Sequence, residues 1–158
     1  MMAHFLREEL WRKPPMPGII AVTGNGYVTK DGRLVMGRGA ALQACERIPG
    51  IDREAGAIVS KYSSVDWNHI YHWIVVREQF LAQVGFAIFQ VKYSWRDEAS
   101  LGLIEESTTA LLEYTRKNPE LNIRMNFPGI GNGRRADAFE EIKRILSVLP
   151  NTVTICYR

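Results

Sequence analysis

The pattern of hydrophobic and polar positions predicts strands that alternate with amphipathic helices. Short apolar runs rich in β-branched and aromatic residues, typical of strands, lie at 19–23, 70–76, 84–91, 121–127 and 152–157. Apolar residues recur at helical spacing in 39–46, 51–62, 101–115 and 137–148. This alternation predicts an α/β fold in which helices cover both faces of one sheet, a three-layer α/β/α arrangement. The short connection between 70–76 and 84–91 makes these strands antiparallel neighbours, so we expect a mixed, mostly parallel sheet.

Prolines separate the first residues from the main body of the chain. The run 14–18 reads Pro-Pro-Met-Pro-Gly, which we interpret as a connection and not as a domain boundary. Residues 1–158 are therefore expected to form a single domain, with 1–18 as an N-terminal extension or a first strand. Charged residues crowd the first 17 positions, and no apolar run approaches the length of a membrane span. We expect a cytoplasmic monomer without membrane contact.

The amino-acid composition restricts the possible ligands and cofactors only slightly. The 158 residues are 46% hydrophobic and 23% charged, which is typical of a globular protein, and the net charge of +3 suits an anionic ligand. Cys45 and Cys156 lack metal-site spacing. His69 and His72 lie three residues apart in a predicted strand, so they should point to opposite faces and cannot easily share a metal. We therefore expect neither a metal nor another cofactor.

Two glycine-rich loops are the strongest chemical signal. Gly37 and Gly39 lead directly into a predicted helix, where the backbone can approach a ligand closely and the first N–H groups favour an anion. A second loop, 128–133, reads Pro-Gly-Ile-Gly-Asn-Gly and lies between a predicted strand and a predicted helix. Two such loops suit a nucleotide diphosphate.

Two common phosphate-binding motifs fit poorly. The chain contains no Gly-Lys-Ser/Thr sequence, so it has no Walker A loop. A dinucleotide fingerprint can be read from Gly131, Gly133 and Ala136, but the strand that follows ends at Tyr157-Arg158 without an acidic residue to hold a ribose. A Rossmann half-domain is the weaker interpretation.

Four segments in order resemble a known family. They are Thr-Gly-Asn-Gly-Tyr-Val at 23–28, Val-Met-Gly-Arg-Gly-Ala-Ala-Leu-Gln-Ala at 35–44, Val-Lys-Tyr-Ser-Trp at 91–95 and the loop 128–133. Together they resemble a macrodomain, the ADP-ribose-binding module, over 19–157. The chain is most similar to a bacterial and phage group of macrodomains related to the terminal ADP-ribose protein glycohydrolases.

The resemblance implies a ligand and a set of binding residues. The adenosine would occupy a hydrophobic cleft, the diphosphate would lie between the two glycine loops, and the distal ribose would lie near Asn25. ADP-ribose, free or attached to a protein or nucleic acid, is the implied partner. The implied ligand-binding residues are Thr23, Asn25, Met36, Gly37, Arg38, Gly39, Ala40, Ala41, Gly129, Ile130, Gly131, Asn132, Gly133 and Arg134.

The resemblance also implies two catalytic candidates. Lys92 matches the position of a lysine associated with attack on the distal ribose, and a partly desolvated lysine can act as a nucleophile. A phosphate-binding or merely solvated lysine is the alternative. The related glycohydrolase pattern has an aspartate where this chain has Arg135, and Asp137 is the nearest acid, in a sequence that also resembles a helix cap. Hydrolysis of an ADP-ribose conjugate and non-catalytic binding, as a reader or sponge, therefore both remain open.

Overall fold

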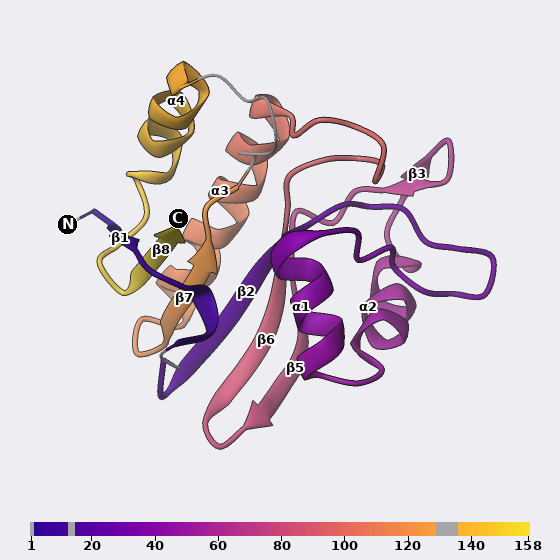
Figure 1. The fold of residues 1–158 in the computed structure, drawn as a ribbon, viewed down its shortest axis with the longest axis horizontal. Helices are drawn as coiled ribbons and strands as arrows, with labels where there is room; N and C mark the ends of the chain where they lie inside the picture. The colour runs from indigo at the N-terminus through magenta and orange to yellow at the C-terminus, as the bar shows by residue number, and fades with distance from the viewer. Residues whose placement is uncertain (1, 13–14, 129–135) are drawn as a thin grey trace.

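A six-stranded mixed sheet runs through the molecule, with two helices packed on each face (Figure 1). The computed structural model describes residues 2–12, 15–128 and 136–158. The strands of the sheet, in spatial order, are β1 (His4–Arg7), β8 (Val153–Tyr157), β7 (Asn122–Asn126), β2 (Gly18–Gly24), β6 (Val84–Gln90) and β5 (Trp73–Leu81). All neighbours are parallel except β5 and β6, which are antiparallel. The predicted α/β/α fold with a mixed, mostly parallel sheet is confirmed.

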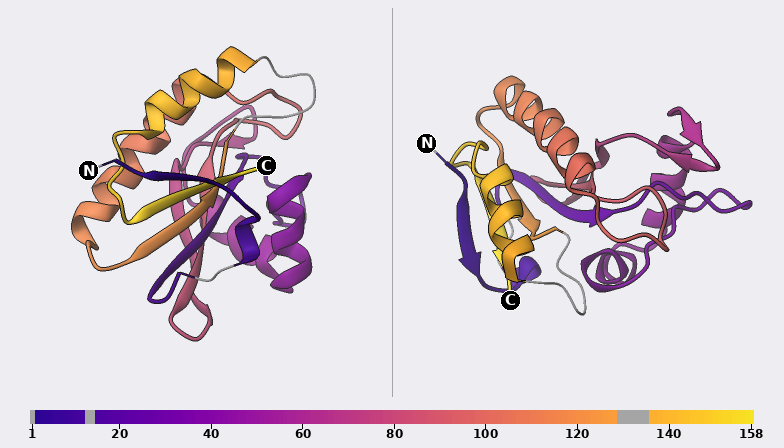
Figure 2. Two further views of the ribbon diagram at one scale, coloured as in Figure 1. Left: turned by 60° about the vertical axis from the view of Figure 1, so that its left-hand side comes forward. Right: turned by 90° about the horizontal axis from the view of Figure 1, so that it is seen from above.

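The helices divide into two pairs, one on each face (Figure 2). These are α1 (Gly39–Arg47) and α2 (Ile51–Val59) on one face, and α3 (Leu101–Lys117) and α4 (Ala136–Leu146) on the other. The central strand β2 shows why both faces are apolar: Ile19 and Ala21 pack toward α3 and α4, whereas Ile20 and Val22 pack toward α1 and α2. A strand buried on both faces reads as a continuous apolar run, as this one does.

The structure corrects several predicted boundaries. Residues 70–72 do not belong to β5, because Tyr71 and His72 direct their backbone N–H groups to a glutamine side chain and His72 has a φ of 63°. The predicted helix 51–62 ends at Val59. A small hairpin of β3 (Ser64–Val65) and β4 (Asn68–His69) was not predicted. His69 lies in β4 and His72 lies outside any strand, so the prediction that they share one strand is wrong.

The N-terminal segment is held against the sheet by a buried arginine. β1 pairs with β8, and the short 3-10 helix η1 (Leu10–Arg12) follows it. Arg124 of β7 is 5% exposed and donates to the carbonyl oxygens of Glu9 and Leu10, at 2.6 and 2.7 Å. Its third bond, 2.6 Å long, goes to the Glu8 carboxylate. One side chain thus fixes three consecutive residues that lie more than a hundred positions away.

We predict that Arg124→Met lowers the free energy of unfolding by about 3 kcal/mol, because it leaves the Glu8 carboxylate and two carbonyl groups without their buried donor. Urea unfolding measures this loss. Lys117→Met is the control, since it breaks an exposed pair with Glu113 one helical turn away. Equal stability of the two variants would contradict the anchoring role of Arg124.

Within the described ranges, no helix combines the length and the apolar character that crossing a bilayer requires.

Candidate functional site

The carboxyl ends of β2, β6 and β7 meet at one edge of the sheet, where ligands bind in open α/β folds. Hydrogen bonds join the loops that leave these strands. Val91 N–H donates to the Gly24 carbonyl at 2.9 Å, and Gly26 N–H donates to the Tyr93 carbonyl at 3.0 Å. At the neighbouring strand, Asn126 accepts from the Thr23 N–H at 3.0 Å and donates to the Thr23 hydroxyl at 2.9 Å. The predicted ligand residue Thr23 therefore lies at this edge, tied to β7.

Helix α1 begins at the same edge with its first turn uncapped. The N-cap residue Arg38 makes no side-chain capping bond, and the first turn contains no acidic residue. By contrast, the Ser100 hydroxyl of α3 accepts from the Leu103 N–H at 3.2 Å. The first N–H groups of a helix carry partial positive charge and favour an anion. Among the residues that the structure describes, no side chain caps the start of α1, an arrangement that favours an external anion.

Gly37 and Gly39, at the start of α1, have different backbone conformations. Gly39 has a φ of +61°, which favours glycine, whereas Gly37 has no such requirement. An added Cβ at either position would meet no atom of the described residues within 4 Å, and both glycines are exposed. The prediction of a special backbone conformation holds for Gly39 only. Of the other predicted residues here, Arg38 is exposed, Ala40 is half-buried, and Ala41 and Met36 are buried in the core beneath.

A pocket of about 330 Å³ extends from the start of α1 across the ends of β7 and β8. It is lined by Glu8, Leu10, Gly39, Ala40, Gln43, Asn126, Phe127, Phe139, Cys156, Tyr157 and Arg158. The rings of Phe127 and Phe139 stack at 4.4 Å, and Tyr157 meets Phe139 edge-on at 5.4 Å. An aromatic wall and an uncapped helix terminus therefore share one pocket, which suits a molecule with a flat base and a phosphate.

The ionisable groups that line this pocket include Glu8 and Cys156. The Glu8 carboxylate is held by Arg124, as described above. Burial, the main cause, raises the pKa of the Cys156 thiol to about 11; Glu8 adds to the shift, and Arg124 opposes it. The thiol is therefore neutral at physiological pH and is a poor nucleophile. Cys156 contributes to the pocket wall and not to chemistry.

Asn25 lies at the edge but is only 3% exposed. Its amide nitrogen donates to the Val35 carbonyl at 2.9 Å, and its amide oxygen accepts from the Tyr27 N–H at 2.8 Å. The Tyr71 hydroxyl donates to the Asn25 carbonyl at 2.8 Å, and burial raises the pKa of Tyr71, so it remains a neutral donor. Asn25 therefore ties the loop after β2 to the segment that leads to α1.

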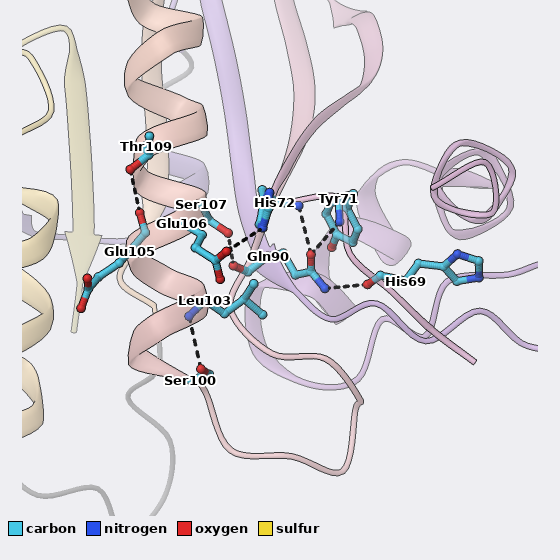
Figure 3. A network of polar contacts seen from close by, with 10 residues as sticks. All are labelled: His69, Tyr71, His72, Gln90, Ser100, Leu103, Glu105, Glu106, Ser107 and Thr109. Atoms are coloured by element: carbon cyan, nitrogen blue, oxygen red, sulfur yellow. Dashed lines mark hydrogen bonds and ion pairs between the residues drawn. The ribbon is translucent and has the colours of Figure 1, made fainter. Parts of the chain in front are cut away.

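The Gln90 side chain, at the end of β6, is the centre of a polar network (Figure 3). It contacts the backbone of His69, Tyr71, His72 and Lys92. Sequence analysis did not identify this residue, since a glutamine that ends an apolar strand gives no local signal of burial.

Lys92 follows β6 at the same edge and is half-buried. Its ammonium group donates to the Trp95 carbonyl at 3.2 Å. Trp95 is 44% exposed, and the Arg96 guanidinium lies 5.0 Å from its ring centroid, so Trp95 is not a core residue. Lys92 thus has the position at the end of a strand that the sequence predicted.

The remaining predicted site residues are outside the described residues. They are Gly129, Ile130, Gly131, Asn132, Gly133, Arg134 and Arg135, together with the side chain of Asp137. Among the described residues, no three His, Cys, Asp or Glu side chains lie together as metal ligands would.

Comparison with solved structures identifies the fold. The macrodomain of Thermus aquaticus DarG superposes with a TM-score of 0.75 at 21% identity, covering 99% of this chain and 98% of that one. The macrodomain of Mycobacterium tuberculosis DarG gives a TM-score of 0.74 at 22% identity, covering 99% and 97%. Thermosipho africanus DarTG in complex with ADP-ribose gives 0.70 at 19% identity, covering all of this chain and 42% of that one. The chain therefore has the macrodomain fold.

This chain is similar to these proteins more in its structure than in its amino-acid sequence. No family model matches the chain, and no curated protein sequence does so. The fold predicted from the four short motifs is nevertheless the one observed.

Proposed function

We propose that this protein binds ADP-ribose across the carboxyl edge of its sheet. The observation that carries the proposal is the pocket in which an aromatic wall adjoins the uncapped start of α1. A similar structure, DarTG of Thermosipho africanus, is described in complex with ADP-ribose, which supports the same ligand here. The backbone N–H groups of Gly39, Ala40 and Ala41 would hold the diphosphate, with the favourable end of the helix dipole behind them.

The aromatic wall is the proposed adenine site. The base would stack on Phe139, whose ring is already fixed by Phe127 and Tyr157. The Glu8 carboxylate lines the same pocket and can accept a hydrogen bond from an exocyclic amine while it keeps its bond to Arg124, because a carboxylate offers several acceptor sites. This arrangement favours adenine over a base without that amine.

The distal ribose would lie toward Asn25 and Lys92, at the other end of the same edge. Asn25 shapes this end through its bonds to Val35 and Tyr27. From the other side, Gly129, Ile130, Gly131, Asn132 and Gly133 would cradle the phosphates, and Arg134 would add a positive charge. Met36, Gly37 and Arg38 would complete the first loop.

We further propose that the protein releases ADP-ribose from a protein or nucleic-acid conjugate in the cytoplasm of a bacterium or phage-infected cell. Lys92, as the free amine, would attack C1″ of the distal ribose and break the bond to the conjugate. Water would then release ADP-ribose and regenerate the lysine. Asp137 would supply the acid–base group. A reader that binds without release uses the same site and lacks only this step.

Titration calorimetry tests the binding proposal. We expect ADP-ribose to bind the wild-type protein with a 1:1 stoichiometry and more tightly than ATP, because ATP lacks the distal ribose that the site would contact. Clear heat with ATP or NAD and none with ADP-ribose would overturn the proposal. Release is measured separately, on ADP-ribosylated protein and DNA.

A further inference from the structure

The buried amide of Gln90 has every hydrogen-bonding position filled. Figure 3 shows its bonds to His69, Tyr71 and His72. Its oxygen accepts from the Tyr71 and His72 N–H groups at 2.9 and 3.0 Å. Its nitrogen donates to the carbonyl oxygens of His69 and Lys92 at 2.9 and 3.3 Å. The residue is 0% exposed, so no water competes for these bonds. All four partners are backbone groups, from two segments of the chain.

The loop after β2 packs against the same amide. A Cβ added to Gly26 would lie 2.0 Å from the His69 carbonyl oxygen and 2.8 Å from the Gln90 amide nitrogen, so only glycine fits there. Gly26 also accepts from the His69 N–H at 2.8 Å and donates to the Tyr93 carbonyl at 3.0 Å. Three segments, 24–27, 69–72 and 91–93, therefore meet around one side chain.

An apolar side chain of similar size would fill the position of Gln90 in the core equally well. The other six residues of β6 are Val84, Gly85, Phe86, Ala87, Ile88 and Phe89, and all are buried. Burying an amide among them costs free energy unless its partners are in place. The amide is needed because residues 69–72 run beside β6 without the regular backbone hydrogen bonds of paired strands. Regular pairing with β6 begins only at Trp73, and His72 has a φ of 63°, which no regular strand contains. Gln90 supplies the bonds that a regular strand would have made.

We infer that Gln90 is a positioning residue for Lys92. Its amide fixes the Lys92 backbone, while the Trp95 carbonyl holds the ammonium end of the same side chain. Val91, the residue before Lys92, makes two backbone hydrogen bonds. Its N–H donates to the Gly24 carbonyl, and its carbonyl accepts from the Ser100 N–H. Lys92 is thus held at a fixed place beside the loop that contains Asn25. This role rests on the proposed function, since it concerns the lysine assigned to the release of ADP-ribose.

Gln90→Met tests the inference, because methionine has nearly the same length and volume but makes none of the four bonds. In the folded variant we expect the kcat for ADP-ribose release to fall about 100-fold, the scale of a 1 Å misplacement, with little change in KM. Hydrogen exchange of the Gly26 amide, which donates to the Tyr93 carbonyl, should rise. Circular dichroism and thermal unfolding establish that the variant is folded at the assay temperature.

Ser107→Ala is the matched control. The Ser107 hydroxyl donates to the Gln90 backbone carbonyl at 2.7 Å, from the α3 side, and is also buried. Its loss removes a buried hydrogen bond from the same residue but leaves the amide network intact. We expect wild-type kcat and wild-type exchange at Gly26. If Gln90→Met does not fold, Gln90→Glu replaces it, because the glutamate keeps the shape of glutamine and still accepts from Tyr71 and His72. Even when protonated it has one donor in place of the two that reach the His69 and Lys92 carbonyl oxygens.

The outcomes separate the two proposals. A wild-type protein that does not bind ADP-ribose overturns the proposed function and the role of Gln90 with it. A wild-type protein that binds ADP-ribose but releases none overturns the role of Gln90 in release and leaves the binding proposal in place. The inference is also wrong if a folded Gln90 variant releases ADP-ribose as fast as wild type, or if Ser107→Ala slows release as much as the Gln90 variant does.

Discussion

Gly39→Glu is expected to abolish ADP-ribose binding, with an affinity loss of at least about 100-fold, since opposed like charges in an interface cost several kcal/mol. Gly39 starts α1 and lines the pocket, and a Cβ added there would meet no atom of the described residues within 4 Å. The new carboxylate would therefore take the place proposed for a phosphate. Calorimetry with ADP-ribose measures the loss.

The substitution has two opposing effects on stability. The φ of +61° strains any residue other than glycine, by about 1 kcal/mol. A glutamate in the first turn stabilises a helix through its dipole, which offsets part of this cost. Gly39→Ala is the control, because it introduces the strain without the charge, and it should keep most of the affinity. If both variants bind equally well, the phosphates do not contact the start of α1.

The start of α1 could be predicted from the sequence because its signal is local. Gly37 and Gly39 followed by alanines indicate a helix that begins at a loop able to approach a ligand, and the helix begins at Gly39 as expected. The alternation of strands and helices was equally readable, since each element buries its own apolar face. The fold class and the part of the proposed site at the start of α1 can therefore be predicted from short stretches of sequence.

The aromatic wall could not be predicted in the same way. Phe139 reads as the apolar face of a helix and Tyr157 as the end of a strand, and both lie about a hundred or more residues from Gly39. Glu8 reaches the pocket because Arg124 holds its segment, a contact between residues 116 positions apart. The local sequence around Glu8 and around Arg124 gives no signal that these two residues pair. Such contacts depend on tertiary packing, which local propensity does not encode.

The first strand, which the sequence left open as an alternative to an N-terminal extension, gave a weak signal for a different reason. β1, with the sequence His-Phe-Leu-Arg, is mostly exposed and contains only two apolar residues, so it lacks the run that marks a buried strand. It is an edge strand defined by its pairing with β8. The start of β5 was misplaced because the Gln90 side chain takes the N–H groups of Tyr71 and His72. In both cases the hydrogen-bonding partner lies outside the local stretch of sequence.

Lys92→Ala is expected to reduce release of ADP-ribose from a conjugate at least about 100-fold while the affinity for ADP-ribose changes little. The proposed nucleophile acts only in the chemical step, so its removal lowers turnover without weakening the ground state. Single-turnover release from ADP-ribosylated protein and DNA, together with calorimetry, measures both quantities. Lys61→Ala is the control, since Lys61 is an exposed lysine outside the proposed site.

Lys92→Arg separates nucleophilic chemistry from charge. Arginine keeps the positive charge but does not lose its proton at physiological pH, so it cannot attack C1″. If Lys92 is the nucleophile, the arginine variant binds ADP-ribose and releases none. If the lysine only pairs with phosphate, Lys92→Arg keeps its activity and Lys92→Ala loses affinity. Full release by Lys92→Ala would show that another group performs the reaction. A wild-type protein that binds tightly but never releases ADP-ribose would be a reader, in which Lys92 contributes charge alone.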